Sequence, residues 1–247
     1  MPELPDVEIV RRKLARWLTG RKITDASTRD AWVARPSPRS FSRVLEGRRV
    51  RAVERRGKWL RVLLDDGARL FSHLGMTGDW VRVAKGAPPE RFERARIDAG
   101  ASSVRYVDAR RFGRLVATRK DIDEWSTLGP DPLTDGVDVS ALAKTKRAVK
   151  EALMDQTLVA GVGNIIATEA LWHAHVDPRA PARDLEARDL RTIAREIRRE
   201  IDRELRPGQT RWSVYGKRGE PCPRCGSKIR SVKLGGRTTA FCPKCQA

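Results

Sequence analysis

Two Cys-x-x-Cys pairs near the C-terminus restrict the fold of the chain more than any other feature. They are Cys222 with Cys225 and Cys242 with Cys245, separated by the 16 residues 226–241, and they contain all four cysteines of the chain. Each pair can place two thiolates around one tetrahedral ion, and this spacing is typical of a zinc ribbon. Four thiolate ligands close the coordination shell. We therefore expect one structural zinc ion, with a redox or iron–sulfur site as the alternative.

The segment between the two pairs has the pattern of a β-hairpin. Residues 233–239 place Gly235 and Gly236 at the turn, with Arg237 beside them. A bound metal ion would hold this basic tip rigidly. The simpler interpretation is that the charges only keep the surface soluble.

The N-terminus offers a second kind of chemistry. Removal of the initiator methionine, which is common before a small residue, leaves Pro2 with a secondary amine at the chain end. An α-amino group has a pKa of about 7.7–8.0, well below the value of about 10.4 for lysine, so a useful fraction is neutral at pH 7. Such an amine can attack an aldehyde-level carbon and form an iminium, with Glu3 beside it for proton transfer. The alternative is that proline only sets the backbone for a helix start.

A helix is predicted immediately after this start. Apolar residues recur at helical spacing over 6–18, with Asp6 as the expected N-cap and Gly20 after the end. Burial of the apolar stripe would hold Pro2 in a fixed place, which covalent catalysis requires.

Composition indicates the partner. The 247 residues include 51 Lys and Arg against 32 Asp and Glu, which gives a formal net charge of +19. Such a charge is typical of a nucleic-acid-binding protein, with a ribosome-like or membrane-surface protein as the alternatives. No apolar run approaches the length of a membrane span, and no signal region precedes the acidic start. We therefore expect a soluble cytoplasmic protein associated with the nucleoid.

The region from about residue 22 to 117 has the pattern of short strands. The predicted strands are 49–54, 58–64, 69–74, 80–83, 103–107 and 114–118. Asp66 and Gly67 indicate a hairpin turn between two of them, and Lys58 lies at another turn. Strands of this length and spacing predict an antiparallel sandwich or barrel. Lys58 could reach a phosphate or an active site, or could simply be a solvated turn residue.

Two loops carry unusual residues. Met76 lies in the loop 73–78, and Arg110 and Phe112 lie in the loop 108–113. On a basic DNA-binding surface, apolar residues at such positions can act as wedges between bases. The alternative, slightly favoured by the local pattern alone, is that Met76 and Phe112 belong to the core. The three histidines, His73, His173 and His175, are interpreted as structural, the last two without partners.

The second half of the chain is predicted to be helical. A proline-rich stretch, 125–133, is the expected linker, and helices are predicted over 140–154, 164–175 and 184–205. Between the first two helices, Gly161 and Gly163 allow tight turns, and Asn164 is the expected cap of the next helix. Exposed amides at such a helix start bind phosphate well, although glycine spacing alone is weak evidence for it.

Several of these stretches together resemble the formamidopyrimidine-DNA glycosylase/endonuclease VIII family of base-excision repair enzymes. The resemblance covers nearly the whole chain and rests on residues 2–5, 56–58, 108–113, 155–165, 215–221 and 235–237 together with the two cysteine pairs. It implies an α+β fold with an N-terminal β-sandwich that includes an N-terminal helix, a central helix-two-turn-helix domain and a C-terminal zinc ribbon. The expected domains are 1–120, 121–211 and 212–247.

The resemblance also implies an activity. Such an enzyme binds damaged double-stranded DNA, as an expected monomer, and flips the damaged nucleotide out of the stack. Pro2, Glu3 and Lys58 are then the expected catalytic residues: Pro2 displaces the base and forms an imine, Glu3 transfers protons, and β- and δ-elimination cut the strand. Lys58, Asn164 and Arg237 hold the phosphates around the lesion. The gap left in the helix is filled by Met76, Arg110 and Phe112.

This chain departs from the family pattern at three places. Asp6 stands where many relatives have Glu, Ile166 stands where Tyr is frequent, and the link 206–214 before the ribbon is short. In relatives that excise 8-oxoguanine well, a long loop in that link closes over the flipped base. We therefore expect ring-opened purines or oxidised pyrimidines to be excised at least as well as 8-oxoguanine. The alternatives are an endonuclease VIII-like enzyme for oxidised pyrimidines, or a DNA-binding protein that has lost turnover.

Overall fold

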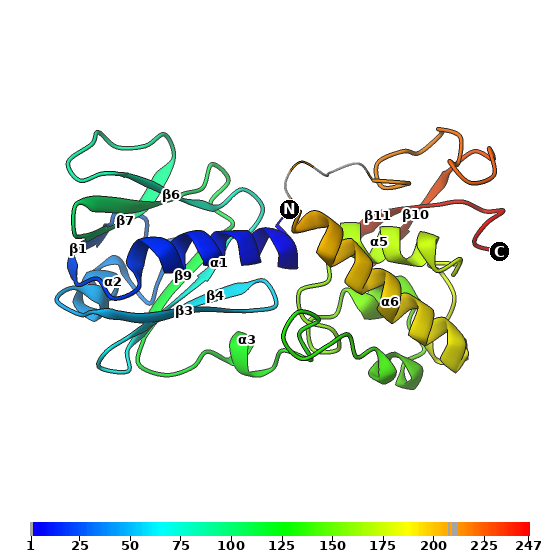
Figure 1. The fold of residues 1–247 in the computed structure, drawn as a ribbon, viewed down its shortest axis with the longest axis horizontal. Helices are drawn as coiled ribbons and strands as arrows, with labels where there is room; N and C mark the ends of the chain where they lie inside the picture. Colours follow the sequence, from blue (N-terminus) through cyan, green and yellow to red (C-terminus); the bar gives the residue numbers. More distant parts are fainter. Residues whose placement is uncertain (1, 207, 209–211) are drawn as a thin grey trace. The chain divides into compact units, whose positions relative to one another are not determined.

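The computed structural model describes residues 2–206, 208 and 212–247. These residues form two compact units. Unit 1 contains Pro2 and the segment Asp6–Ser126, and unit 2 contains Glu3–Pro5 and the segment from Thr127 to the C-terminus (Figure 1). Residues 3–5 therefore belong to unit 2, although Pro2 and Asp6 on either side of them belong to unit 1. Within the described residues, no helix is both long and apolar enough to cross a membrane.

Unit 1 is built on two β-sheets. The order in the four-stranded sheet is β1 (Ile23–Thr28), β7 (Glu93–Ala99), β8 (Ser102–Val107) and β6 (Asp79–Ala84). The order in the five-stranded sheet is β2 (Ala34–Arg35), β9 (Arg114–Thr118), β5 (Arg69–His73), β4 (Trp59–Leu64) and β3 (Val50–Arg56). All pairings between these strands are antiparallel except that of β2 with β9. The six predicted strands are confirmed, and Gly67, with φ of 81°, lies in the turn from β4 to β5 as expected.

Apolar residues from both sheets form one core, as in a β-sandwich. Leu60, Val62 and Leu70 come from the five-stranded sheet, and Ile97 and Val104 come from the four-stranded sheet; all five are buried. Alternation along a strand sends successive side chains to opposite faces, which lets charged residues such as those of β3 remain outside. The predicted β-sandwich is therefore confirmed.

Two helices complete this core. In α1 (Leu4–Leu18), Val7, Val10, Leu14 and Leu18 are buried at helical spacing, and α2 (Pro38–Leu45) buries Phe41 and Leu45. The predicted helix is confirmed, but it begins two residues earlier than expected. Asp6 consequently lies in the first turn, and its prediction as the N-cap was wrong. A short helix, α3 (Asp123–Ser126), ends unit 1.

Unit 2 consists of helices followed by a hairpin. The elements are η1 (Ser140–Lys144), α4 (Val149–Leu153), α5 (Asn164–His173), η2 (Ala182–Asp184), α6 (Ala187–Glu204), β10 (Arg230–Leu234) and β11 (Arg237–Phe241). The predicted hairpin of the C-terminal module is confirmed, with Gly235 and Gly236 at positive φ in its turn. The α+β fold predicted from sequence is thus the fold observed.

The helix predicted over 140–154 was wrong. The chain forms the 3₁₀ helix η1 and then the short helix α4, with Thr145 in an extended conformation after η1. The intervening segment pairs instead with residues 180–183, because Ala182 N donates to Arg147 O at 2.9 Å and Val149 N donates to Ala180 O at 2.8 Å. These long-range bonds satisfy the backbone groups that a continuous helix would have used.

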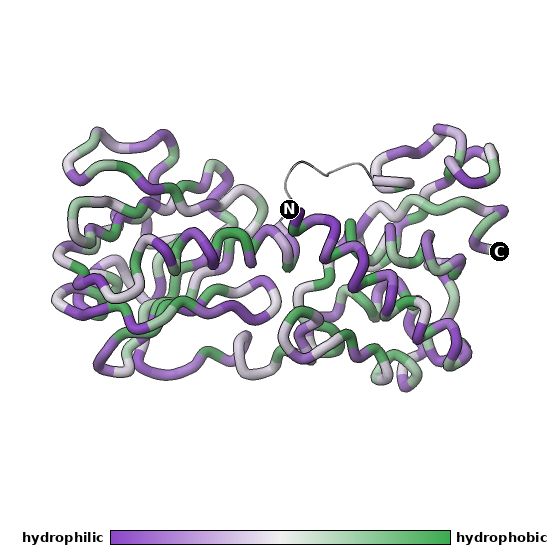
Figure 2. Tube along the Cα trace, in the orientation of Figure 1, coloured by the Kyte–Doolittle hydropathy of each residue, from purple (hydrophilic) through white to green (hydrophobic). Residues whose placement is uncertain are grey.

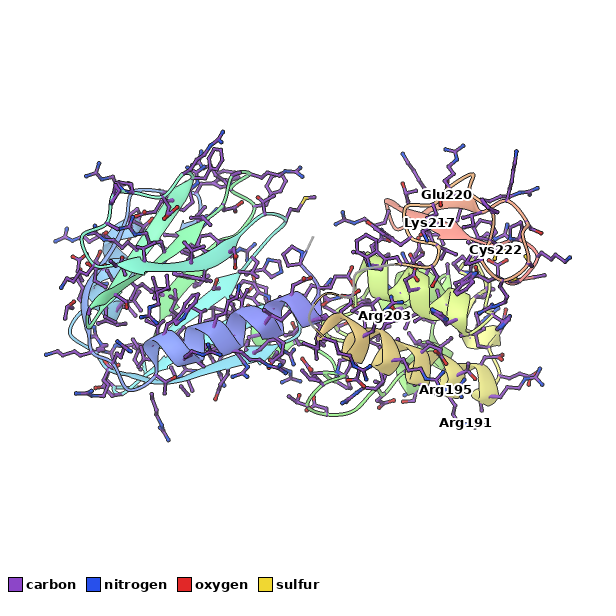
Figure 3. All side chains as sticks on the ribbon, turned by 45° about the horizontal axis from the view of Figure 1, so that its top comes forward. Arg191, Arg195, Arg203, Lys217, Glu220 and Cys222 are labelled. Atoms are coloured by element: carbon purple, nitrogen blue, oxygen red, sulfur yellow. The ribbon has the colours of Figure 1, made fainter. Side chains whose placement is uncertain are left out.

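Helix α6 is hydrophilic along most of its length (Figure 2). It carries Arg191, Arg195 and Arg203, which are distributed along it in Figure 3. Two of its acidic residues, Glu196 and Glu200, are buried together with three isoleucines of the same helix.

Candidate functional site

The carboxylate of Glu3 is fixed at the start of α5. Only 1% of Glu3 is exposed, and its two oxygens accept hydrogen bonds from the backbone amides of Gly163 at 3.1 Å, Ile165 at 2.8 Å and Ile166 at 3.1 Å. A helix N-terminus presents unpaired amides and a partial positive charge, so a carboxylate is well stabilised there. Glu3 occupies these three amides, so phosphate binding by them, for which the glycine spacing was weak evidence, is not supported.

The glycines before α5 make room for the chain start. A Cβ at Gly163 would overlap the Glu3 side chain, and a Cβ at Gly161, which has φ of +86°, would overlap Leu4. The amide of Leu4 also donates to the carbonyl of Gly161 at 3.1 Å, and Leu4 is fully buried in the core of unit 2. Pro2 is half-buried and covalently next to Glu3, so the anchoring of residues 3 and 4 restricts its position.

Lys58 lies in the turn between β3 and β4, which is tied to α1. The buried guanidinium of Arg55 donates from Nε to Glu8 at 3.3 Å and from Nη1 to the carbonyl of Gly57 at 3.1 Å. Burial alone would raise the pKa of Glu8, but hydrogen bonds from Arg11 and Arg12 hold it below its usual value. Glu8 is therefore a carboxylate that connects α1 to the turn carrying Lys58. This pair was not predicted from the sequence, in which Arg55 and Glu8 are separated by 47 residues.

His73 lies near Lys58 and is a packed residue, as expected. Burial, followed by the charges of Lys58 and Arg114, lowers the pKa of His73 to about 4. Its Nδ1 accepts a hydrogen bond from the amide of Gly75 at 3.1 Å, and its ring lies 5.0 Å from that of Trp59. His73 is therefore neutral at pH 7 and helps to fix the start of the loop that carries Met76.

The loops that carry Met76, Arg110 and Phe112 are held by one buried carboxylate. Asp108 accepts hydrogen bonds from the Thr77 hydroxyl at 2.5 Å and from the amides of Arg110 at 3.1 Å and Gly113 at 2.8 Å. Asp108 itself was not among the residues predicted from the sequence. A signal was available, because an aspartate at the start of a turn often binds the amides that follow it.

The side chains on these loops are presented outwards. Phe112 is 54% exposed, and the Arg110 guanidinium lies 4.6 Å from the centre of its ring. Met76 is half-buried. The alternative that Phe112 is a core residue was therefore wrong.

In unit 2, Asn164 and the β10–β11 hairpin are brought together. Asn164 is the first residue of α5 and not its cap, which is Gly163, so that prediction was wrong. Its side-chain amide donates to the carbonyl of Thr238 at 3.2 Å, next to the exposed Arg237. The fully buried Lys150 donates from Nζ to Asn164 Oδ1 at 2.5 Å and to the Thr239 hydroxyl at 3.3 Å. Lys150 thus joins Asn164 to β11, the strand that begins with Arg237, and no sequence signal indicated it.

The four cysteines converge as predicted. Their Sγ atoms all lie within 4.8 Å of one another, with Cys222 and Cys245 at 4.0 Å and Cys225 and Cys242 at 3.5 Å. A tetrahedral zinc ion with Zn–S bonds of about 2.3 Å requires sulfur atoms roughly 3.8 Å apart. The set therefore fits one structural zinc ion.

The zinc module packs against the end of α5. The Arg224 guanidinium stacks 4.0 Å from the Trp172 ring centre and donates to the Trp172 carbonyl at 3.1 Å. His175 Nδ1 lies 3.2 Å from the carbonyl of Cys245. The expectation that His173 and His175 lack partners was wrong, since His173 Nε2 lies 3.5 Å from Glu200.

A second buried carboxylate fixes the chain where it enters this module. Glu169 is fully buried and accepts hydrogen bonds from the amides of Ser213 at 2.7 Å, Val214 at 2.9 Å and Tyr215 at 2.7 Å. Residues 207 and 209–211 of the link 206–214 lie outside the described residues, so the expected absence of a lid there stays a prediction.

Comparison with known proteins gives matches along the whole chain. The family models are the formamidopyrimidine-DNA glycosylase N-terminal domain over residues 1–115, the formamidopyrimidine-DNA glycosylase H2TH domain over 128–215, and the zinc finger found in FPG and IleRS over 219–247. The formamidopyrimidine-DNA glycosylase of Laribacter hongkongensis is 39% identical over 272 residues, covering 100% of both chains.

Solved structures agree with this result. MutM in complex with carbocyclic 8-oxo-G containing DNA has a TM-score of 0.90 and 31% identity, covering 100% of each chain. The Lactococcus lactis Fpg (MutM) in complex with oxidized pyrimidine containing DNA has a TM-score of 0.90 and 30% identity, covering 99% of each. The sequence and the fold are therefore similar to those of these glycosylases from end to end.

Proposed function

The chain belongs to the formamidopyrimidine-DNA glycosylase family and is a base-excision repair DNA glycosylase, and we propose that it removes oxidised bases from damaged duplex DNA through a covalent imine at Pro2. AP lyase activity is part of the activity of this family. One structural zinc ion is its cofactor.

The observation that carries the proposal is the anchoring of Glu3. Three amides of the α5 N-terminus hold this carboxylate next to the Pro2 amine. A nucleophile on an unrestrained terminus would lose most of its effective concentration, whereas fixed neighbours preserve it. The positive end of the α5 dipole also stabilises the negative charge of the Glu3 carboxylate.

The proposed reaction begins with attack of the Pro2 nitrogen on the sugar C1′. The bond from C1′ to the base breaks, the base leaves with the electron pair, and it takes up the proton that the Pro2 nitrogen loses. The sugar ring then opens as Glu3 relays a second proton, drawn from solvent, to the ring oxygen, and an iminium joins Pro2 to C1′. Loss of a C2′ proton expels the 3′ phosphate, and a second elimination expels the 5′ phosphate. Water finally releases the sugar fragment and regenerates the amine.

We propose that the remaining predicted residues hold the DNA. Lys58, Asn164 and Arg237 bind phosphates around the lesion, which is supported by the bonds that fix Asn164 beside the Arg237 strand. Met76, Arg110 and Phe112 fill the space left by the flipped nucleotide. The exposed ring of Phe112 with its stacked guanidinium suits this task.

We further propose that the enzyme acts as a monomer, with functional domains over 1–120, 121–211 and 212–247. Its substrates are formamidopyrimidines and 8-oxoguanine, with ring-opened purines or oxidised pyrimidines excised at least as well as 8-oxoguanine. The oxidised pyrimidines are favoured as a second class because a relative of the same fold forms a complex with oxidized pyrimidine containing DNA.

Borohydride trapping on duplex DNA with an abasic site tests the chemistry. Borohydride reduces an imine to a stable amine, so protein with a free Pro2 should become cross-linked to the DNA. The same protein with an uncleaved N-terminal tag should give no cross-link, and removal of the tag should restore it. Full trapping by protein verified as blocked would refute Pro2 as the nucleophile.

A further inference from the structure

A hollow of about 900 Å³ lies in unit 1 beside the β1–β7 pair, and its lining includes Arg111, which lies between Arg110 and Phe112 in the loop described above. It is lined by the end of β1, the start of β7, Arg29, Phe92 and Arg111. Binding sites for small molecules typically have volumes of about 300–1,000 Å³, so a nucleotide fits a hollow of this size.

One exposed aromatic ring, that of Phe92, lines this hollow. Among the described residues, the exposed large hydrophobic side chains are Trp32, Phe92 and Phe112. Each ring has a guanidinium over it: Arg91 lies 4.6 Å from the centre of Phe92, and Arg35 lies 5.9 Å from that of Trp32. Flat aromatic and guanidinium surfaces are the platforms on which unpaired bases stack.

The backbone of Phe92 is held in an unfavourable conformation. Its φ is 63°, in the left-handed region that bulky residues rarely adopt. Its carbonyl accepts a hydrogen bond at 3.0 Å from the amide of Asp108, whose carboxylate fixes the loop with Arg110 and Phe112. A strained residue persists where the surrounding structure enforces it, and such residues cluster at binding sites. The strain here presents an aromatic ring to solvent.

The charges around the hollow are divided into two sets. Arg94, Arg96 and Arg111 form ion pairs with Asp30, Asp25 and Asp98. In contrast, Arg29, Arg35 and Arg91 form no ion pair within the described part of the chain, and all three are exposed. Of these three cations, Arg29 lines the hollow and Arg91 lies over the Phe92 ring. Two carboxylates also line the hollow: Glu93, which pairs with Arg105, and Glu90.

We propose that this hollow is a second nucleotide-binding site, which takes an unpaired nucleotide of single-stranded DNA next to the duplex. The base stacks on Phe92, and the phosphate is bound by Arg29 and Arg91. The proposal rests on the proposed function only in taking DNA as the partner. It extends the interface from the lesion to a neighbouring single-stranded segment, such as an overhang or a gap.

Fluorescence anisotropy at fixed salt tests the site. The probe is a blunt duplex with a tetrahydrofuran abasic analogue, compared with the same duplex carrying short thymidine overhangs. The overhangs should tighten binding about five- to hundredfold, the range for one base stacked on an aromatic ring. Phe92→Gly should remove this gain and leave blunt-duplex affinity unchanged, and Phe92→Trp should retain it. Because Gly relieves the positive φ, the melting temperature of Phe92→Gly should not fall.

The matched charge control is Arg188→Ala on α6, which changes net charge as Arg91→Ala does. Arg91→Ala should reduce the overhang gain, and Arg188→Ala should not. Cross-linking from 5-iodouracil in the overhang should map to Phe92 in the wild-type protein. The proposal is overturned by an absent gain, by an equal gain from double-stranded extensions, by full retention in Phe92→Gly, or by cross-links elsewhere. Imine trapping on the blunt abasic duplex, measured in parallel, reports separately on the proposed function.

Discussion

Replacement of Glu3 by glutamine should weaken unit 2 as well as the chemistry. The three amides at the start of α5 all donate to the Glu3 carboxylate, and the group is buried. Glutamine has one acceptor oxygen and an NH₂ group in place of the second. One α5 amide must then face another donor, and the negative charge at the helix N-terminus is lost.

The magnitude follows from these bonds. A hydrogen bond to a charged group contributes about 1.5–3 kcal/mol, against about 0.5–1.5 kcal/mol for a neutral one, so three bonds lose roughly 3 kcal/mol. Relief from burying a charge offsets part of this loss. We expect Glu3→Gln to lower the free energy of unfolding of unit 2 by about 2–4 kcal/mol. At about 2–4 °C per kcal/mol, its Tm falls by roughly 5–15 °C.

Differential scanning calorimetry without DNA measures this effect apart from catalysis. The matched control is Asp6→Asn, which removes the same charge from an exposed residue in the first turn of α1. Its effect should stay below about 1 kcal/mol. If Glu3→Gln melted with the wild-type protein, or if the two variants were equally destabilised, the anchoring argument would be refuted.

Three further outcomes are expected. Burial raises the pKa of Glu200 to about 7 from 4.5, so the folded state releases this proton at higher pH than the unfolded chain, and its stability falls as pH rises through that window. Glu200→Gln should therefore gain stability relative to wild type between pH 5 and 8 in urea unfolding; a constant difference would contradict this. Cys242→Ser should lose zinc by metal analysis and lower DNA affinity, whereas wild type without zinc would overturn the site. Single-turnover excision of 8-oxoguanine should be no faster than that of a formamidopyrimidine or dihydrouracil on matched duplexes; a rate more than tenfold above both would show that the short link does not limit recognition.

The features that were predicted best from the sequence are those that depend on a local pattern of residues. The strands, α1 and the β10–β11 hairpin follow from apolar spacing and glycine turns, and the cysteine spacing alone predicted the metal site. Prediction from the sequence failed where long-range backbone hydrogen bonds replaced local ones. The segment 145–149 pairs with residues 180–183, so the helix predicted across it does not form. Strands β1 and β7 were also missed: a bulge between Ile23 and Asp25 breaks the alternation of β1, and the buried face of β7 is carried mainly by two alanines.

The residues of the candidate site likewise divide into those that could be predicted from the sequence and those that depend on long-range contacts. Pro2, Glu3 and the cysteines could be chosen from their chemistry and spacing. However, sequence could not show that Glu3 occupies the amides of α5, because the two segments are separated by about 160 residues. Lys150 has no distinctive neighbours in the sequence, and Asp108 opens a loop that was predicted without a role for Asp108 itself. Their importance lies in the hydrogen bonds that they make to residues already chosen, Asn164 and Arg110.

Glu169 gives a physical basis for the expected lesion preference. It accepts hydrogen bonds from the amides of Ser213, Val214 and Tyr215, and Val214 is fully buried, so the chain is fixed from residue 213 onwards. Helix α6 ends at Glu204. A lid drawn from this link has only residues 205–212 available, and the same residues connect the two fixed points. We expect such a short link to provide fewer hydrogen bonds to a flipped base than a long loop would. A polar contact missing from the base edge costs about 1–3 kcal/mol, which corresponds to roughly a five- to hundredfold slower excision of a base that depends on the lid. Cleavage of an abasic site has no base to cover and should keep its full rate.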